Sequence, residues 1–175
     1  MGEELAKRKP TRLKGFDYNS RGVYFLTICT QNRQCILSHV VGTGLPDCPS
    51  VQLAPHGEIA DKIINQLNDF YEDISVDRYV IMPNHIHLLL FVRQGGQSGR
   101  PVPTTKVDAN SIVSRFVSTF KRFCNKEYRE NIWQSRFNDH IIRNQQDYEA
   151  HVRYIHENPI RWHLDELYLP TADET

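Results

Sequence analysis

Two histidines in a short apolar segment, His85-Ile86-His87, have the clearest potential for chemistry. Side chains alternate between the two faces of a strand, so both imidazoles point to one side and Ile86 to the other. Two imidazoles on one face can bind a single divalent ion. The alternative is a half-polar strand face without a metal. The apolar run that follows, Leu88 to Val92, makes imidazoles without partners costly there.

A tyrosine and an asparagine share one face of a predicted helix near the end of the chain. Tyr154 and Asn158 are four residues apart, and a rotation of about 100° per residue brings their side chains within about 40° of each other. The amide oxygen of Asn158 is a ligand type that Mg²⁺ and Mn²⁺ accept, so it could complete a three-ligand site with open positions for phosphate oxygens. The alternative is structural, with Tyr154 as a half-buried aromatic residue and Asn158 as a helix stop before Pro159.

Two other side chains of this helix are candidates for the same chemistry. Tyr148 is a competing nucleophile, but it lies about 240° around the helix from Tyr154, so both cannot face one metal. His151 lies near the Tyr154 face, where it could orient the hydroxyl group or contact a phosphate. The alternative for His151 is an exposed residue without a role.

These residue types together suit the cleavage of a phosphodiester. A divalent ion polarises a phosphate, and a tyrosine phenolate displaces the deoxyribose 3′ oxygen to leave a covalent phosphotyrosine. The adduct retains the bond energy, so a free 3′ hydroxyl can attack it and rejoin strands. Imidazole ligands are also compatible with Zn²⁺, which leaves the identity of the metal open.

The hydrophobic pattern predicts the elements that position these residues. Strands are expected at residues 23–29, 78–82 and 85–92, with an extended segment at 132–142. Helices are expected over residues 57–72, from a cap at Asp108, and over 145–157 before Pro159. Loops are expected at residues 42–55 and 93–107.

The order of these elements is strand, helix, strand, strand, helix, strand and an extra helix. This order predicts an α+β fold of the ferredoxin-like, split βαβ type. It has an antiparallel sheet, helices on one face and an additional C-terminal helix that carries the tyrosine. Apolar stripes are expected to face the core: Ile59, Ile63, Ile64, Leu67 and Phe70 in the first helix, and Ile112, Phe116, Val117, Phe120 and Phe123 in the second. Many functions use this topology, so it does not identify the activity.

The composition is typical of one globular domain. The 175 residues are 39% hydrophobic and 24% charged, without an apolar run long enough to span a membrane. The four cysteines form neither a C-x-x-C pair nor a dense framework, as in a protein with reduced thiols. These observations predict a cytoplasmic protein with a flexible basic arm at residues 1–14, a domain at 15–163 and a tail at 164–175.

Charge is balanced over the chain but unevenly distributed along it. Lysine and arginine (21) equal aspartate and glutamate (21), yet residues 1–33 and 81–146 are basic and residues 34–80 are acidic. Such a molecule can present a positive face to a phosphate backbone while it remains neutral overall, although ordinary solvated surface gives the same pattern.

Two segments resemble a known family. The segment from Tyr79 to Leu89, YVIMPNHIHLL, closely resembles the signature of single-tyrosine HUH transposases, in which two histidines flank a hydrophobic residue. The later blocks, IWQSRF at 132–137, DYE at 147–149 and YIHENP at 154–159, resemble the branch called REP-associated tyrosine transposases. The resemblance covers roughly residues 15–163.

The resemblance implies a ferredoxin-like domain with Mg²⁺ or Mn²⁺ bound by the histidine pair. It implies the metal ligands His85, His87 and Asn158, and Tyr154 as the catalytic nucleophile that forms a 5′ phosphotyrosine. The insertion-sequence members commonly have glutamine as the third ligand, so Asn158 departs from their pattern. The implied substrate is single-stranded DNA with a hairpin, in the REP-associated members an imperfect palindrome preceded by a short guide sequence.

Contacts to this DNA would come from the basic arm and the basic helix. The candidate DNA-binding residues are Lys14, Arg21, Lys121, Arg122, Lys126, Arg136 and Arg143, and solvated surface is the alternative for each. Two other function classes remain open: a binding module without catalysis, which would expose aromatic residues on its central strands, and a small-molecule phosphoesterase in which Tyr154 is structural. The chain could act as a monomer or a homodimer.

Overall fold

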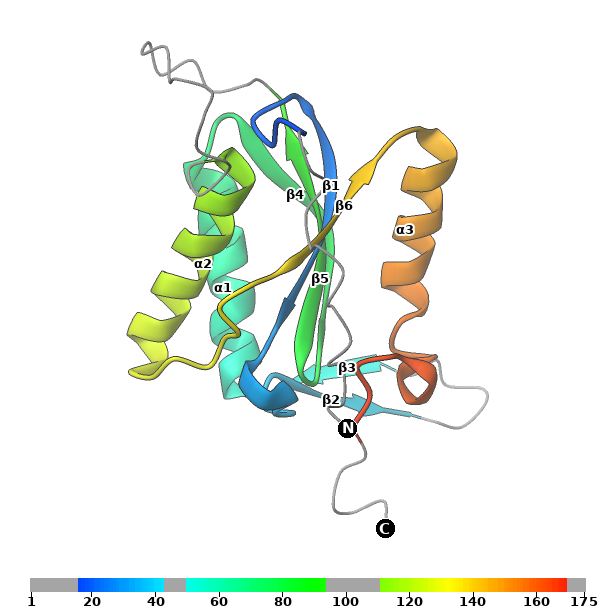
Figure 1. Cartoon of the computed structure of the whole chain (residues 1–175). Helices are drawn as coiled ribbons and strands as arrows, with labels where there is room; N and C mark the ends of the chain where they lie inside the picture. The colour runs from blue at the N-terminus through cyan, green and yellow to red at the C-terminus, as the bar shows by residue number, and fades with distance from the viewer. Residues whose placement is uncertain (1–15, 43–49, 94–110, 170–175) are drawn as a thin grey trace, which may run out of the picture.

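A four-stranded antiparallel sheet lies at the centre of the fold (Figure 1). This computed structural model describes residues 16–42, 50–93 and 111–169. The sheet has the order β4-β5-β1-β6, with strands Gly22–Cys29 (β1), Ile74–Met82 (β4), His85–Val92 (β5) and Asn138–Ile142 (β6). The predicted strands at 23–29 and 85–92 are confirmed. Strand β4 begins earlier than predicted, and β6 occupies only the second half of the predicted extended segment.

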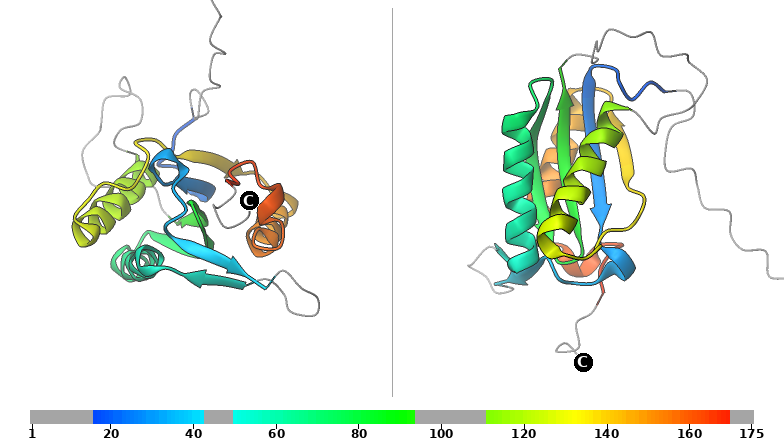
Figure 2. Two further views of the ribbon diagram at one scale, coloured as in Figure 1. Left: turned by 90° about the horizontal axis from the view of Figure 1, so that it is seen from below. Right: turned by 90° about the vertical axis from the view of Figure 1, so that its left-hand side faces the viewer.

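Strand β5, which begins with the two histidines, is buried on both faces. All of its residues except Phe91 are buried, because helices cover both sides of the sheet (Figures 1 and 2). A strand covered on both sides has a nearly continuous apolar sequence, which explains the run after His87. The register pairs Cys29 with His85 and Thr27 with His87, so β1 supplies the neighbours of both imidazoles on one side.

Helices α1 (Pro55–Phe70) and α2 (Ile112–Tyr128) cover one face of the sheet (Figure 1). Most of the predicted apolar positions contact the core, but Phe70 and Phe123 are exposed, and Cys124 is buried in α2 instead. The Ser111 side chain caps α2 by accepting a hydrogen bond from the Ser114 amide. The predicted cap, Asp108, lies outside the described residues.

Helix α3 (Gln145–Glu157) covers the opposite face of the sheet (Figure 2). Its bounds are those predicted, because both ends have local signals. The Asn144 side chain accepts a hydrogen bond from the Asp147 amide at 2.8 Å, and Pro159 follows the C-cap Asn158. The α+β fold with a four-stranded antiparallel sheet and three helices is therefore confirmed, with α3 on the face opposite α1 and α2.

The prediction of a loop over residues 42–55 is wrong for residues 50–53, which form a strand, and for residue 55, which begins a helix. Strands β2 (Ser38–Val41) and β3 (Ser50–Leu53) form a separate antiparallel pair, and α1 begins at Pro55. The glycine and prolines of residues 44–49 are typical of a loop, so the sequence did not indicate this pair of strands. Those residues lie outside the described ranges. Gly57 in α1 packs tightly against Leu37, the residue before β2, where an added Cβ would overlap the Leu37 carbonyl oxygen.

Short 3-10 turns lie at Gln31–Arg33 (η1) and Trp162–Leu164 (η2). The predicted arm at 1–14 and most of the predicted loop at 93–107 lie outside the described residues. The predicted tail begins inside η2, and residues 165–169 belong to the described part of the chain. No helix of the described ranges is both long and apolar enough to cross a membrane.

Candidate metal and tyrosine site

The two histidines face α3 and are enclosed by protein. His85 and His87 are 0% and 3% exposed, and their ring centroids are 4.4 Å apart. Because they occupy alternate positions of β5, both imidazoles stand on one face of the sheet, as the sequence predicts.

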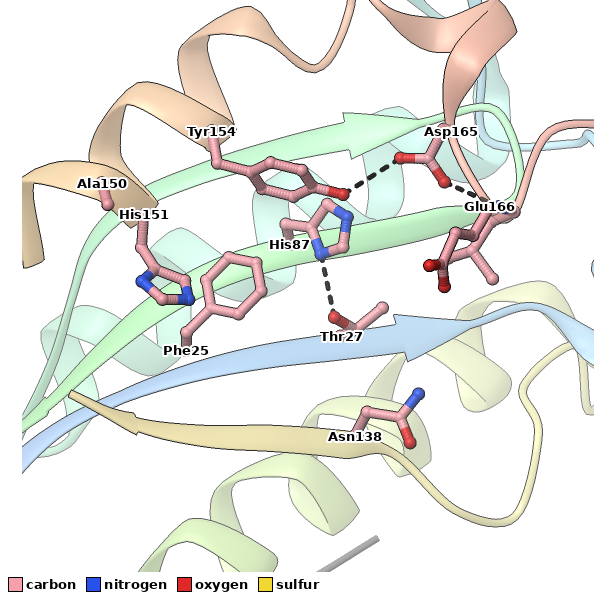
Figure 3. Close-up of a pocket in the computed structure, with 10 residues that line it drawn as sticks. Phe25, Thr27, His87, Asn138, Ala150, His151, Tyr154, Asp165 and Glu166 are labelled. Atoms are coloured by element: carbon pink, nitrogen blue, oxygen red, sulfur yellow. Dashed lines mark hydrogen bonds between the residues drawn. The ribbon is translucent and has the colours of Figure 1, made fainter. Parts of the chain in front are cut away.

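Each imidazole is oriented through its Nδ1 atom. His87 Nδ1 lies 2.9 Å from Thr27 Oγ1, and His85 Nδ1 lies 2.8 Å from Asn84 Oδ1 (Figure 3 shows the His87 contact). The Asn84 amide nitrogen donates to the Leu167 carbonyl oxygen, which leaves its Oδ1 as an acceptor. His85 Nδ1 is therefore the donor, and its Nε2 has a free lone pair.

Both Nε2 atoms are buried, and neither has a hydrogen-bond partner in the described part of the chain. Burial lowers the pKa of His85 to about 3 and the pKa of His87 well below its usual value. The nearby Arg33 adds to the effect on His85, and His85 adds to the effect on His87. Neutral imidazoles are the form that binds a divalent metal through a ring nitrogen with a free lone pair, and for His87 this nitrogen is Nε2 when Nδ1 donates to Thr27.

Asp165 supplies a carboxylate beside the histidines, and the sequence analysis missed it. The ligand atoms of His85, His87 and Asp165 all lie within 4.8 Å of one another. A negative charge beside two buried Nε2 atoms that have no hydrogen-bond partner among the described residues fits a cation, so this group is a possible metal site. The sequence gives no local signal for Asp165, because it follows η2 in a polar segment that was interpreted as a tail.

Asn158 is also brought to this group. It is buried at the end of α3, and its amide nitrogen donates to Asp165 Oδ2 at 2.9 Å. Its Oδ1 atom is buried and has no hydrogen-bond partner among the residues described. The predicted role of Asn158 as a ligand stays a prediction, with Asp165 as a second source of oxygen.

The Tyr154 side chain points into the same site (Figure 3). Its ring centroid is 5.1 Å from that of His87, and its hydroxyl group donates to Asp165 Oδ2 at 3.1 Å. The residue is 44% exposed, so an outside molecule can reach it. Burial of the hydroxyl group, followed by the charge of Asp165, raises the pKa of Tyr154 to about 12.

Tyr148 faces a different part of the sheet. Its hydroxyl group donates to Asp77 Oδ2 at 2.5 Å, and its ring contacts Phe91. As predicted from the helical rotation, Tyr148 and Tyr154 do not share one site.

Comparisons with known proteins identify several relatives of this chain. No family model matches the chain. The chain is 30% identical over 174 residues to an uncharacterized protein of Haemophilus influenzae, with 93% of each chain covered. It is 28% identical over 144 residues to the REP-associated tyrosine transposase of Escherichia coli, with 82% of this chain and 70% of the relative covered. A putative REP-associated tyrosine transposase of Haemophilus influenzae is 24% identical over 152 residues, with 83% and 74% covered.

The chain is a homologue of the REP-associated tyrosine transposases by sequence and by fold.

A solved structure of a REP-associated tyrosine transposase bound to a REP hairpin has the same fold. Its TM-score is 0.56 at 21% identity, and the alignment covers 98% of this chain and 94% of that one. The family is of the HUH, single-tyrosine type, and the His85 and His87 group is consistent with an HUH site.

An open pocket adjoins the group of His85, His87, Asp165 and Tyr154. It has a volume of about 440 Å³ and lies between the sheet and α3 (Figure 3). Its walls come from β1, β5, β6, α3 and the segment after η2: Phe25, Thr27, His87, Asn138, Ala150, His151, Tyr154, Asp165, Glu166 and Leu167. The predicted auxiliary residue His151 is therefore near Tyr154, and its ring contacts Phe25.

The candidate DNA-binding residues of this transposase homologue are spread over the molecule. Arg122 and Lys126 lie on α2, across the sheet from Tyr154, whereas Arg136 and Arg143 flank β6. Arg21 is exposed just before β1, and Lys14 lies outside the described residues. The candidates that belong to the described residues are not gathered around the tyrosine.

Lys121 is already engaged within the fold. Its ammonium group donates to the carbonyl oxygens of Gln134 and Arg136, at 2.7 and 3.0 Å. Burial lowers the pKa of Lys121 to about 8. Its predicted contact with DNA would require the loss of these bonds.

Proposed function

We propose that the chain is a metal-dependent, single-stranded DNA endonuclease and strand transferase that cleaves hairpin-containing DNA through a 5′ phosphotyrosine on Tyr154. The observation that carries the proposal is the convergence of a carboxylate, a partly exposed tyrosine that donates to it, and two buried imidazole nitrogens without hydrogen-bond partners among the described residues. The family relationship supports the same activity.

The metal-binding residues in this proposal are His85 and His87, joined by Asn158, with Asp165 as the further oxygen ligand. Mg²⁺ or Mn²⁺ bound there supplies positive charge that stabilises the phosphate as its negative charge increases. Thr27 and Asn84 hold the imidazole rings so that both Nε2 atoms face the site. These outer contacts fix the geometry of the ligands before DNA arrives.

Tyr154 is the nucleophile in the proposed reaction. Its oxygen forms a bond to the phosphorus, and the bond from phosphorus to the deoxyribose 3′ oxygen breaks. The hydroxyl proton passes to Asp165 Oδ2, which accepts its hydrogen bond, and the departing 3′ oxygen takes a proton from water to become a hydroxyl group. The reverse attack by a 3′ hydroxyl restores a phosphodiester and frees the tyrosine, which gives strand transfer.

One chain supplies every residue of this site. The histidines, Tyr154 and Asp165 come together within a single copy, so the proposed reaction needs no residue from a second chain. The reaction can therefore occur in a monomer.

The geometry gives less support to a binding module of the RNA-recognition type. Such modules bind nucleic acid on an open sheet face, whereas α3 covers the face that carries His87 and Phe25 (Figures 1 and 3). A small-molecule phosphoesterase would not need the tyrosine hydroxyl group, which the covalent test below addresses directly.

Covalent capture tests the proposal. Wild-type protein, Mn²⁺ and a hairpin oligonucleotide with single-stranded extensions are expected to give an adduct that survives denaturing electrophoresis. Tyr154→Phe is expected to abolish the adduct, because the attacking oxygen is lost. Tyr148→Phe, the same substitution on the same helix outside the site, is expected to retain it. An adduct that persists in Tyr154→Phe would show that another residue is the nucleophile.

A further inference from the structure

We propose that the pocket beside Tyr154 binds one unpaired nucleobase next to the scissile phosphate, with the Phe25 ring as its apolar contact. This inference rests on the proposed nuclease function, since Tyr154 and His87 form one wall of the pocket. A molecule that fills the pocket therefore lies directly beside the attacking oxygen and the metal ligands.

Phe25 is the central aromatic residue of this pocket. It projects from β1 toward α3 and is only partly buried. Its ring centroid is 5.0 Å from that of His87, 4.6 Å from that of His151 and 5.9 Å from that of Tyr154. The part of the ring that borders the pocket is an apolar surface beside a polar catalytic group, which suits the flat face or edge of a base.

The aromatic contacts continue to the edge of the sheet. His151 stacks on His140 of β6 with ring centroids 4.7 Å apart. His140 Nε2 lies 3.0 Å from Asp147 Oδ2, and His151 Nδ1 lies 2.8 Å from the Asp147 carbonyl oxygen. His87, Phe25, His151 and His140 thus form a row of rings across the sheet. Asp147 fixes the outer end of this row, so the Phe25 side of the pocket is held in place before DNA binds.

Polar groups at the rim can recognise a base edge. The Asn138 side chain is exposed at the pocket, and no hydrogen bond to another described residue occupies its amide. An asparagine amide offers a donor and an acceptor together, which is the pattern that pairs with adenine. His151 Nδ1 contacts the Asp147 carbonyl oxygen at 2.8 Å, so its Nε2 remains for a ligand.

The shape of the pocket favours a single unpaired base over a duplex. A volume of about 440 Å³ lies at the lower end of small-molecule sites, roughly 300–1,000 Å³, and the sheet and α3 close two sides of it. A paired base cannot enter while it remains paired. The occupant is therefore a base from a single-stranded part of the substrate.

Fluorescence of 2-aminopurine tests this inference. The junction is first mapped from the adduct of the wild-type protein. Uncut complexes are then formed with Tyr154→Phe protein and oligonucleotides that carry 2-aminopurine at single positions on either side of the junction. We expect quenching at one position next to the junction. In the same background, Phe25→Leu is expected to remove that quenching and to weaken DNA binding about 5- to 150-fold.

Phe91→Leu is the matched control. Phe91 lies on the same face of the sheet, further along β5, and contacts Tyr148 outside the pocket. We expect it to leave both quenching and affinity unchanged. A second measurement does not depend on how well Phe25→Leu folds: an abasic nucleotide at the quenched position is expected to weaken binding of the Tyr154→Phe protein by a similar factor.

The two proposals fail in different ways. If the wild-type protein forms an adduct but no base next to the junction is quenched, or if Phe25→Leu and Phe91→Leu behave alike, the nucleobase pocket is wrong and the nuclease proposal stands. If the wild-type protein forms no adduct with any hairpin oligonucleotide, both proposals are wrong.

Discussion

The buried histidines predict a specific loss of stability in mild acid. In the folded protein without metal, burial lowers the pKa of His85 from 6.5 to about 3. The unfolded chain, with a pKa near 6.5, therefore takes up the proton first as the pH falls. Stability from the neutral imidazole is fully present above pH 6.5 and is lost progressively between pH 6.5 and 3.

The size of this effect follows from the shift in pKa. Each pH unit in that window costs about 1.4 kcal/mol for one histidine, so lowering the pH from 7 to 5 costs about 2 kcal/mol through His85. The pKa of His87 is lowered in the same direction, so it adds a loss of the same sign. For a domain with a free energy of unfolding of about 5–15 kcal/mol, this is a large fraction.

Urea unfolding in EDTA at pH 7 and pH 5 measures the effect. His85→Gln removes one titrating group, so the difference in unfolding free energy between the two pH values is expected to shrink by about 2 kcal/mol relative to wild type. His39→Gln, a matched change at an exposed histidine in β2, is expected to leave the difference unchanged. An equal pH dependence in wild type and His85→Gln would refute the argument that burial keeps this imidazole neutral.

Further predictions concern the metal, Asp165 and the fold. Mn²⁺ at about 100 times its Kd is expected to stabilise the protein by about 2.7 kcal/mol, which raises Tm by roughly 5–11 °C in a thermal melt, and EDTA should reverse the rise. His85→Ala and His87→Ala should each remove this rise in Tm and abolish DNA cleavage. Both variants should retain hairpin binding in a gel-shift assay, because affinity comes largely from phosphate contacts. Loss of hairpin binding would show that the histidines are needed for DNA binding as well as for cleavage. Asp165→Asn is expected to weaken Mn²⁺ binding about 10- to 100-fold by calorimetry, and unchanged affinity would remove Asp165 from the metal group. Gly57→Ala should cost about 1–3 kcal/mol in urea unfolding through overlap with Leu37, whereas Gly22→Ala, where a Cβ meets only the Tyr24 ring at 3.8 Å or more, should cost less.

The positions of the histidine pair and of α3 could be predicted because their signals are local. Alternation along a strand places His85 and His87 on one face whatever the rest of the chain does. The α3 helix has a cap at Asn144 and a stop at Pro159, so its bounds and the direction of Tyr154 follow from a short segment.

The remaining parts of the site depend on contacts between distant segments. Asp165 reaches the histidines only because the chain turns back after α3, and no spacing rule links it to β5. Phe25 looks like an ordinary strand residue until β1 is paired with β5 and covered by α3. Likewise, Lys121 looks like a free basic side chain until the carbonyl groups of Gln134 and Arg136 are found beside it.

The return of the chain after α3 affects where the protein can be shortened. The sequence predicts a domain that ends at residue 163, and a minimal fragment designed from the sequence would stop there. Such a fragment would lose the acceptor for the Tyr154 hydroxyl group and the Leu167 carbonyl oxygen that fixes Asn84, and through Asn84 the orientation of His85. A truncated version for biochemical work should therefore extend at least through residue 169.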